Sequence, residues 1–285
     1  MVALATAAAV VTFAPRGSRG QSRTSKSGPA SPVKSTVSTR PSKAAAASST
    51  LTAAAARNQV LRDELTWTFG GKQQRGWYLY DTLLAETLNT DESPVSADFA
   101  EAVTKWQKRR GLSATGVFDQ NSWMGMVSYW QGNRLKDRTT ATPDQLVTAP
   151  PGDFYDPSRA AELRQVERAT YDAYLKMIAA ASDDLKLSAK DRSLKIISAF
   201  RSREYQEQLR RKSPNAGSAG LAVNNSPHFT GRALDLYVGG DPVDTKDANR
   251  AIQVKTPAYK WLVRNADKFG FRPYFYEPWH WEYVK

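Results

Sequence analysis

The sequence predicts an α+β fold in which two folded regions follow a disordered tail. Helix and strand patterns mix along residues 155–285 without the regular alternation that gives a parallel α/β sheet. The length of 285 residues corresponds to about two domains of roughly 150 residues each. A run of about 18 apolar residues, as a membrane-spanning helix requires, does not occur, which excludes an integral membrane bundle.

The net charge of +12 belongs mainly to the tail. Residues 1–57 hold eight basic residues and no acidic one, whereas residues 58–285 hold 32 basic and 28 acidic residues. A surplus of charge outside the folded regions argues against a dedicated nucleic-acid surface. The chain has no Cys, which excludes disulfides, thiolate zinc sites and a Cys nucleophile.

The tail is rich in Ala, Ser, Thr, Pro and basic residues, and few large apolar side chains follow position 13. Such a segment buries too little surface to offset the entropy of ordering it, so we expect disorder over residues 1–57. Residues 2–14 have the length of the apolar part of a signal peptide, although no basic residue precedes them. They are either an export signal or part of an alanine-rich tail.

Residues 58–135 form the first folded region, and its pattern is helical. Ser96 can cap a helix, and Gly111 stands where the end of that helix needs a left-handed residue. A second helix follows Asp119. The apolar stripes of the two helices are Phe99, Ala102, Val103 and Trp106, and Trp123, Met126, Val127 and Trp130.

Residues 136–154 are rich in Pro and Thr and lack periodicity, which predicts a semi-stiff linker. In the second folded region, residues 155–285, Asp156 and Pro157 have the pattern of a helix start. The later patterns predict a strand at 194–200, a helix at 202–211, a loop at 213–226, a strand at 233–238, a helix at 257–269 and a strand at 279–284.

The chain has only two histidines, His228 and His280. Asp235 lies in an apolar predicted strand, where a bare carboxylate would be costly to bury unless it is paired or binds a metal. Two imidazoles and one carboxylate leave a fourth position open, which is the composition of a catalytic zinc site. Glu277 and Glu282 flank His280 and could each serve as a base, and Glu282 shares a strand face with His280. Packing in a core stays the alternative for either histidine taken alone.

Three short motifs occur in residues 155–285. S-P-H-F-T-G-R-A-L-D at 226–235 has the pattern S-x-H-x-x-G-x-A-x-D, and E-P-W-H at 277–280 has the pattern E-x-W-H. S-A-F-R-S-R-E-Y-Q at 198–206 looks like a third pattern, S-x-[YF]-R-S-x-x-x-Q. Together they resemble the motifs of the vancomycin-resistance-type D-alanyl-D-alanine carboxypeptidases, a family of zinc peptidases. The resemblance implies the fold shared by lysostaphin, these carboxypeptidases and the hedgehog signalling domain. In that fold a small antiparallel sheet with flanking helices carries the metal.

By position, the resemblance implies that His228, Asp235 and His280 bind one zinc ion. Glu277 matches the catalytic base, which takes a proton from water and returns it to the leaving amine. Arg201 matches the cation beside the scissile carbonyl, where it would stabilise the developing oxyanion.

Ser226 and Gln206 match positions that line the substrate side of the site. Ser226 could instead hold the metal-binding loop in place. Arg201 could instead pair with Glu204 or Glu207. Glu282, if it is not the base, would be a carboxylate that supports a metal ligand.

The first folded region contains A-V-T-K-W-Q at 102–107, G-L at 111–112 and G-V-F-D at 116–119, followed by a Trp-containing helix. This order resembles the second half of the three-helix peptidoglycan-binding domain. The D-G-x-F-G turn of that domain's first half is not found between residues 77 and 96. The resemblance implies a wall-binding module that raises the local concentration of substrate at the peptidase.

Together these observations predict an exported zinc peptidase of peptidoglycan stem peptides, most simply a D,D-carboxypeptidase that releases the terminal D-alanine. The alternatives are an endopeptidase of the autolysin or endolysin type, and a non-catalytic cell-wall-binding protein. A nucleic-acid binder is disfavoured by the position of the charge. We expect a monomer in the cell envelope or outside the cell, with one zinc ion, a peptidoglycan partner and no transmembrane segment.

Overall fold

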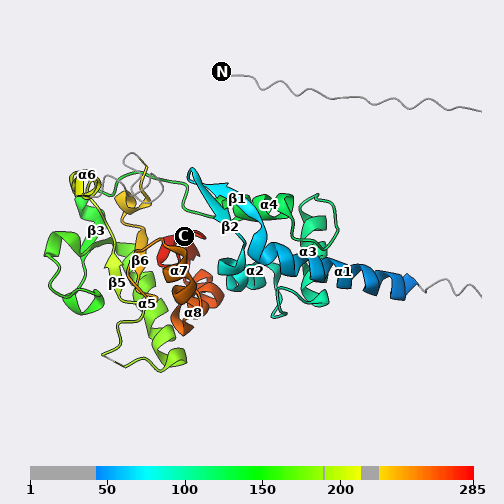
Figure 1. Ribbon diagram of the computed structural model, residues 1–285. Helices are drawn as coiled ribbons and strands as arrows, with labels where there is room; N and C mark the ends of the chain where they lie inside the picture. Colours follow the sequence, from blue (N-terminus) through cyan, green and yellow to red (C-terminus); the bar gives the residue numbers. More distant parts are fainter. Residues whose placement is uncertain (1–42, 189, 213–224) are drawn as a thin grey trace, which may run out of the picture. The chain divides into compact units, whose positions relative to one another are not determined.

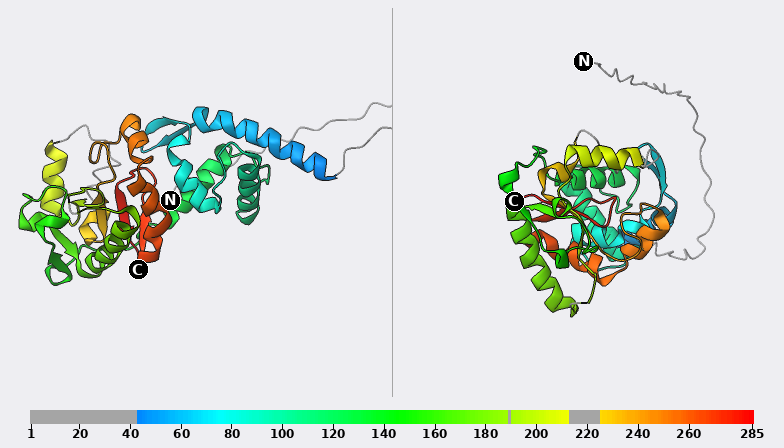
Figure 2. Two further views of the ribbon diagram at one scale, coloured as in Figure 1. Left: turned by 90° about the horizontal axis from the view of Figure 1, so that it is seen from below. Right: turned by 90° about the vertical axis from the view of Figure 1, so that its left-hand side faces the viewer.

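A long helix, α1 (Lys43–Glu64), opens the part of the chain that the computed structural model describes, which is residues 43–188, 190–212 and 225–285 (Figure 1). The first turns of α1 extend past α3 (Ala97–Arg109), whereas its later turns pack against that helix (Figure 2). Ala54 and Ala55 are buried at this contact.

Over residues 43–57 our prediction of disorder is therefore wrong. Alanine has the highest helix propensity of any residue, and small side chains let two helices pack at a short distance. The absence of large apolar side chains, from which we predicted disorder, does not prevent such packing. Residues 1–42, with the possible export signal at 2–14, lie outside the described residues.

A hairpin that we did not predict follows α1. Strands β1 (Thr66–Phe69) and β2 (Lys72–Arg75) pair antiparallel across a two-residue turn. Gly70 and Gly71 form this turn with φ of 56° and 75°, and only glycine adopts such angles without strain.

Three helices, α2 (Asp81–Leu88), α3 and α4 (Gln120–Gly132), come next, with the short 3-10 helix η1 (Tyr78–Tyr80) before them. The predicted caps of α3 and α4 are confirmed. The Phe99 N–H donates to Ser96 Oγ at 3.0 Å, and the Ser122 N–H donates to Asp119 Oδ1 at 2.9 Å. Gly111 has the expected left-handed φ of 69° after α3 ends.

The segment 136–154, which we predicted as a linker, takes part in the fold. Strand β3 (Leu146–Thr148) pairs antiparallel with β4 (Gln165–Glu167), and the 3-10 helices η2 (Pro143–Gln145) and η3 (Pro151–Asp153) flank β3. The Pro and Thr residues that suggested a linker are compatible with these short turns, because Thr142 caps η2 and proline occupies its first turn.

The helix start predicted at Asp156 and Pro157 is also wrong. Asp156 accepts hydrogen bonds from Ser158 and closes a local turn, which the 3-10 helix η4 (Ala161–Leu163) follows. Pairing with β3 keeps residues 165–167 extended, so α5 (Arg168–Leu185) begins only after β4, with Glu167 as its N-cap.

The second folded region centres on an antiparallel sheet in the order β5–β6–β8–β7, which confirms the predicted α+β class. The strands are β5 (Ile196–Ser198), β6 (Ala233–Leu236), β7 (Phe271–Pro273) and β8 (His280–Tyr283). The helices around it are α5, α6 (Arg203–Lys212), α7 (Asp247–Gln253) and α8 (Pro257–Asn265), with the 3-10 helices η5 (Pro227–Thr230) and η6 (Ala266–Phe269).

The two predicted regions share an aromatic core. The ring of Phe275, in the loop between β7 and β8, lies 5.6 Å from Tyr80, 5.8 Å from Trp130 and 6.4 Å from Trp67. The buried Arg250 of α7 also donates to the Tyr80 hydroxyl at 3.1 Å. Residues 41–285 therefore form one compact unit, and separate folding of 58–135 and 155–285 stays a prediction.

Among the described residues, no helix is both long and apolar enough to cross a membrane.

Asn58 of α1 supports a test of how α1 holds the loop before α4. Its fully buried amide donates to the Gly116 carbonyl at 2.9 Å and accepts the Phe118 N–H at 2.7 Å. We expect Asn58→Ala to lower the free energy of unfolding by about 2–3 kcal/mol, because two backbone groups lose their partner. Urea denaturation followed by circular dichroism measures the change. Asn121→Ala, at an exposed position of α4, is the control and should change it by less than about 0.5 kcal/mol.

Candidate metal centre

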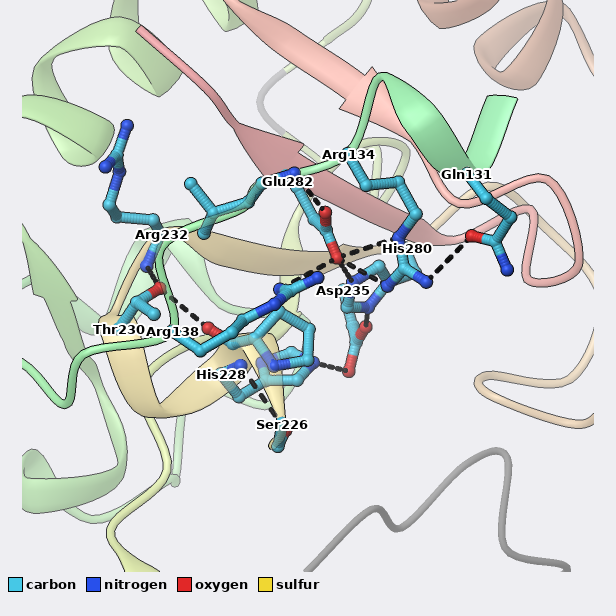
Figure 3. Close-up of polar contacts among 12 residues, drawn as sticks. Gln131, Arg134, Arg138, Ser226, His228, Thr230, Arg232, Asp235, His280 and Glu282 are labelled. Atoms are coloured by element: carbon cyan, nitrogen blue, oxygen red, sulfur yellow. Dashed lines mark hydrogen bonds and ion pairs between the residues drawn. The ribbon is translucent and has the colours of Figure 1, made fainter. Parts of the chain in front are cut away.

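Two histidines and an aspartate from three segments meet in the second region. His228 lies on η5, Asp235 on β6 and His280 on β8 (Figure 3). His228 Nε2 is 3.3 Å from Asp235 Oδ2, and His280 Nδ1 is 2.9 Å from Asp235 Oδ1. One donor atom from each residue lies within 4.8 Å of the others, and all three residues are buried.

Strand register and a tight turn bring these residues together. Asp235 stands directly opposite His280 in the β6–β8 pair, so both side chains project from the same face of the sheet. The chain turns from η5 into β6 through Gly231, which has a φ of 65°. A Cβ on Gly231 would lie 2.8 Å from the Glu167 backbone nitrogen, so only glycine fits this turn.

Hydrogen bonds orient both imidazole rings. His228 Nδ1 lies 2.7 Å from the Ala199 carbonyl oxygen, which can only accept, so Nδ1 carries the proton and Nε2 faces Asp235. His280 Nε2 lies 3.2 Å from Glu282 Oε1, and its Nδ1 faces Asp235. Each ring therefore donates through its outer nitrogen and turns the other nitrogen toward the cluster, as ligand histidines of metal sites do.

Burial and neighbouring charges set the protonation of the cluster. Burial, helped by the nearby Arg201, lowers the pKa of His228 to about 4. Burial acts against the cationic form of His280 too, but hydrogen bonds to Asp235 and Glu282 outweigh it and raise the pKa of His280 to about 9. Burial would raise the pKa of Asp235, but His228 and Arg201 hold it well below its usual range. Asp235 is thus a carboxylate at neutral pH.

The donor set fits a divalent metal such as zinc. Zinc bonds of about 2.0–2.1 Å in a tetrahedron put neighbouring donor atoms about 3.3 Å apart. The separation of 3.3 Å between His228 Nε2 and Asp235 Oδ2 matches this spacing. Nitrogen and carboxylate donors without Cys are typical of catalytic zinc sites.

Glu277 lies in the loop between β7 and β8, three residues before His280. Its carbonyl accepts the His280 N–H at 2.9 Å, which fixes the two residues in one turn. The residue is only 9 % exposed, and burial raises the pKa of Glu277 to about 7 against the attraction of His280, with Asp235 adding to the rise. A carboxyl group that titrates near neutrality is suited to general acid–base chemistry.

Arg201 follows β5 and turns toward the cluster. Its Nη2 lies 2.5 Å from Asp235 Oδ2, and its Nε donates to Ser198 Oγ at 2.9 Å. The alternative pairing of Arg201 with Glu204 or Glu207 is wrong, because the Arg201 guanidinium binds Ser198 and Asp235, while Glu207 pairs with Arg210. Arg201 thus places a cation beside the candidate metal ligands.

Glu282 is fully buried, and its surroundings do not suit the role of a general base. It accepts hydrogen bonds from the His280 ring, the Arg134 and Arg138 guanidinium groups and the Leu135 N–H. Burial would raise its pKa, but His280 and Arg134 outweigh burial and hold the pKa of Glu282 far below its usual range. A group that stays ionised at neutral pH is a poor proton acceptor, so this geometry favours a supporting role for Glu282 over that of base.

The two substrate-side candidates have different surroundings. Ser226 caps η5, and its Oγ accepts the His228 N–H at 3.3 Å, which fits the alternative role of holding the His228 loop in place. Gln206 is buried in α6, and neither polar atom of its amide has a hydrogen-bond partner among the described residues. Most of the loop predicted at 213–226 lies outside those residues.

Arg134 and Arg138, which bind Glu282, were not predicted from the sequence. A buried carboxylate beside a ligand histidine does require a cation nearby. Nothing in the local pattern, however, indicates that the Glu282 partner stands 148 residues earlier in the chain. Tyr274, whose ring centroid is 5.8 Å from that of His280, was also not predicted.

A known protein family matches the part of the chain that contains the cluster. The model of the VanY family, D-alanyl-D-alanine carboxypeptidase, matches residues 163–285. These residues form a VanY-type peptidase domain. The matched residues contain His228, Asp235 and His280, and the match supports a peptidoglycan-acting peptidase for residues 163–285.

Among solved structures, the chain is similar to the LdcB LD-carboxypeptidase, whose structure is reported to reveal the molecular basis of peptidoglycan recognition. The identity is 25%, and the match covers 50% of this chain and 70% of that chain with a TM-score of 0.38. Comparison with curated proteins gives no match.

The raised pKa of Glu277 makes a prediction about the metal-free VanY-type domain. A carboxyl group with a pKa of 4.5 when unfolded and about 7 when folded destabilises the fold once the unfolded state ionises. Glu277→Gln should therefore unfold like the wild type below pH 4.5 and gain stability over it as the pH rises to 7. The gain should level off near 3 kcal/mol above pH 7, the difference of the two pKa values at about 1.4 kcal/mol per unit.

Thermal and urea unfolding of the full chain in the presence of a chelator, from pH 4 to 8, measures this difference. Glu162→Gln, at an exposed position of η4, serves as the control. A Glu277→Gln variant that is no more stable than the wild type at pH 8 would contradict the raised pKa.

Proposed function

We propose that the chain is a zinc-dependent peptidase that hydrolyses peptidoglycan stem peptides and releases the terminal D-alanine, a D,D-carboxypeptidase. The observation that carries the proposal is the buried cluster of His228, Asp235 and His280 with Glu277 in the adjoining turn. The VanY-type domain supports the class of substrate.

His228, Asp235 and His280 would hold the metal through Nε2, a carboxylate oxygen and Nδ1, the atoms that face one another. Zinc in such a site supplies Lewis acidity, which polarises a carbonyl oxygen and makes a water molecule more acidic. Ala199 and Glu282 hold the two rings from outside, so both nitrogens stay aimed at one point.

Glu277 is the proposed base. It takes a proton from the attacking water and gives it to the amine that leaves when the peptide bond breaks. A pKa of about 7 suits both steps, because the group exists in both protonation states near neutral pH.

Arg201 is the proposed oxyanion partner. Its guanidinium is held by Ser198 and Asp235 beside the cluster, so its charge is in place before substrate binds. A preorganised donor of this kind contributes roughly 3 kcal/mol to the stability of the transition state. Gln206 and Ser226 remain proposed substrate-side residues, with Ser226 acting through the His228 loop.

The helices α2, α3 and α4 are the proposed wall-binding part of the chain. Support comes from the resemblance of residues 101–127 to the peptidoglycan-binding domain. We propose that the protein acts as a monomer in the cell envelope or outside the cell, where that polymer lies.

Digestion of purified muropeptides followed by mass spectrometry tests the reaction. Loss of one alanine from a pentapeptide stem is expected. Loss of alanine from a tetrapeptide stem would indicate L,D-specificity instead, and monomers released from cross-linked dimers would indicate an endopeptidase. No cleavage by the zinc-loaded protein would contradict a catalytic role.

Removal of one ligand tests the metal assignment. His280→Ala should lose zinc and activity together, because two remaining ligands bind zinc much more weakly than three. Elemental analysis of the purified protein measures zinc per chain, with Asp183→Ala, an exposed carboxylate of α5, as the control. Stoichiometric zinc in His280→Ala would refute the assignment.

A pair of variants separates the base from the supporting carboxylate. Glu277→Gln keeps the size of the side chain and removes its basicity, so turnover should fall by at least about 100-fold while zinc content is retained. Glu282→Gln should lower turnover or zinc affinity by only about 10–100-fold. Alanine release and bound zinc are measured side by side for both variants. An active Glu277→Gln with an inactive, zinc-bound Glu282→Gln would mean that the base is Glu282.

A further inference from the structure

We propose that Arg134, which lies outside the VanY-type domain, is a positioning residue of the metal centre. It holds Glu282, and Glu282 holds the ring of His280. The part of the chain before residue 163 would therefore complete the metal site in addition to any binding of the cell wall. This inference rests on the proposed function, because it takes the cluster of His228, Asp235 and His280 to bind zinc.

Glu282 connects the two parts of the chain. Its Oε1 accepts the Arg134 Nε–H at 3.1 Å and Nη2–H at 2.5 Å, and Arg138 Nη1 at 3.4 Å. The Leu135 N–H donates to its other oxygen at 2.9 Å, and the His280 ring lies 3.2 Å from Oε1 (Figure 3). Three of these four partners belong to the segment that follows α4.

Because Glu282 is buried, loss of its pairing with Arg134 would disturb its position. The residue is 0 % exposed, and a buried carboxylate that loses its cation is drawn toward water. Such a movement would lengthen and weaken its hydrogen bond with the His280 Nε2–H. Because that bond sets which nitrogen of His280 faces Asp235, the loss would reach the metal ligand itself.

Arg134 is itself fixed on several sides. Its Nη1 donates to the Gln131 side chain of α4 at 3.1 Å. Its guanidinium carbon lies 3.9 Å from the centre of the Tyr274 ring, and that ring meets His280 edge-on at 5.8 Å. Gln131 and Tyr274 thus hold Arg134 in the position from which it binds Glu282.

A second ion pair in the first region provides a matched control. Arg62 binds Asp81 through Nε at 3.0 Å and Nη2 at 2.6 Å, with the same two-pronged geometry as Arg134 on Glu282. Neither Arg62 nor Asp81 contacts the metal cluster. Loss of the Arg62 pair therefore reports what a broken ion pair costs by itself.

The first experiment measures the zinc affinity of the full chain by competition with a chelator of known affinity. Arg134→Gln should bind zinc about tenfold more weakly than the wild type, at the lower end of the range for residues that orient ligands. Arg134→Lys keeps the charge without the two-pronged fork, so its loss should be smaller. Arg62→Gln should bind zinc like the wild type.

A double-mutant cycle shows whether Arg134 acts through Glu282. Glu282→Gln can still accept the His280 Nε2–H but carries no charge for Arg134 to hold. If the route is through Glu282, Arg134→Gln should change zinc affinity less than about twofold in the Glu282→Gln background. An equal, additive loss in both backgrounds would refute this route.

An NMR signal gives a readout that a general loss of stability would not move. The chain has only two histidines, so their ring N–H signals can be assigned with one variant. The His280 Nε2–H should give a hydrogen-bonded signal in the wild type and in Arg62→Gln. In Arg134→Gln the His280 Nε2–H signal should broaden or shift, because Glu282 moves away from the His280 ring.

The outcomes separate this inference from the proposed function. Equal zinc affinity and an unchanged ring signal in Arg134→Gln would overturn the positioning role, even if that variant melts at a lower temperature. A wild type that binds zinc without cleaving stem peptides would contradict the proposed function alone. A wild type that does not bind zinc would overturn both.

Discussion

One face of the four-stranded sheet buries three ionisable residues side by side, Asp235, His280 and Glu282. The rest of the structure depends on the need to compensate their charges. None of the three is more than 3 % exposed. Bare charges in such surroundings would cost several kcal/mol each, so every one has partners. Arg201 reaches the cluster from the end of β5, and Arg134 reaches it from the segment after α4. The site thus ties together segments that are far apart in the sequence.

The aromatic core joins the two regions by packing, as the ion pair of Arg134 with Glu282 joins them by charge. Phe275 stands two residues before Glu277, and its ring packs among Tyr80, Trp67 and Trp130 of the first region. The loop that carries the proposed base is therefore backed by residues outside the VanY-type domain. Aromatic residues of the first region therefore pack behind the loop that carries Glu277.

Glu277 is buried like Glu282, but its pKa is shifted in the opposite direction. Burial raises its pKa to about 7, and the attraction of His280 is too weak to offset this effect. The fold becomes less stable by keeping this carboxyl buried at neutral pH, whereas a fully paired carboxylate such as Glu282 would carry no proton to exchange. Proton exchange therefore favours a buried carboxyl with a raised pKa, as at Glu277, whereas stability favours a paired carboxylate, as at Glu282.

The sequence by itself predicted the residues of the cluster, which the structure brings together, and the starts of two helices in the first region. Spacing and motifs pointed to His228, Asp235, His280 and Glu277, and local caps located α3 and α4, because these features depend on residues close in the chain. The Gly-Gly turn of the β1–β2 hairpin was a local signal of the same kind, although we did not use it. Tertiary structure alone decided the ordering of residues 43–57, the pairing of β3 with β4 and the partner of Glu282. Each of these rests on contacts between distant segments, and 148 residues separate Arg134 from Glu282. The sequence shows that a buried charge needs a partner, but only the folded chain shows which residue reaches it.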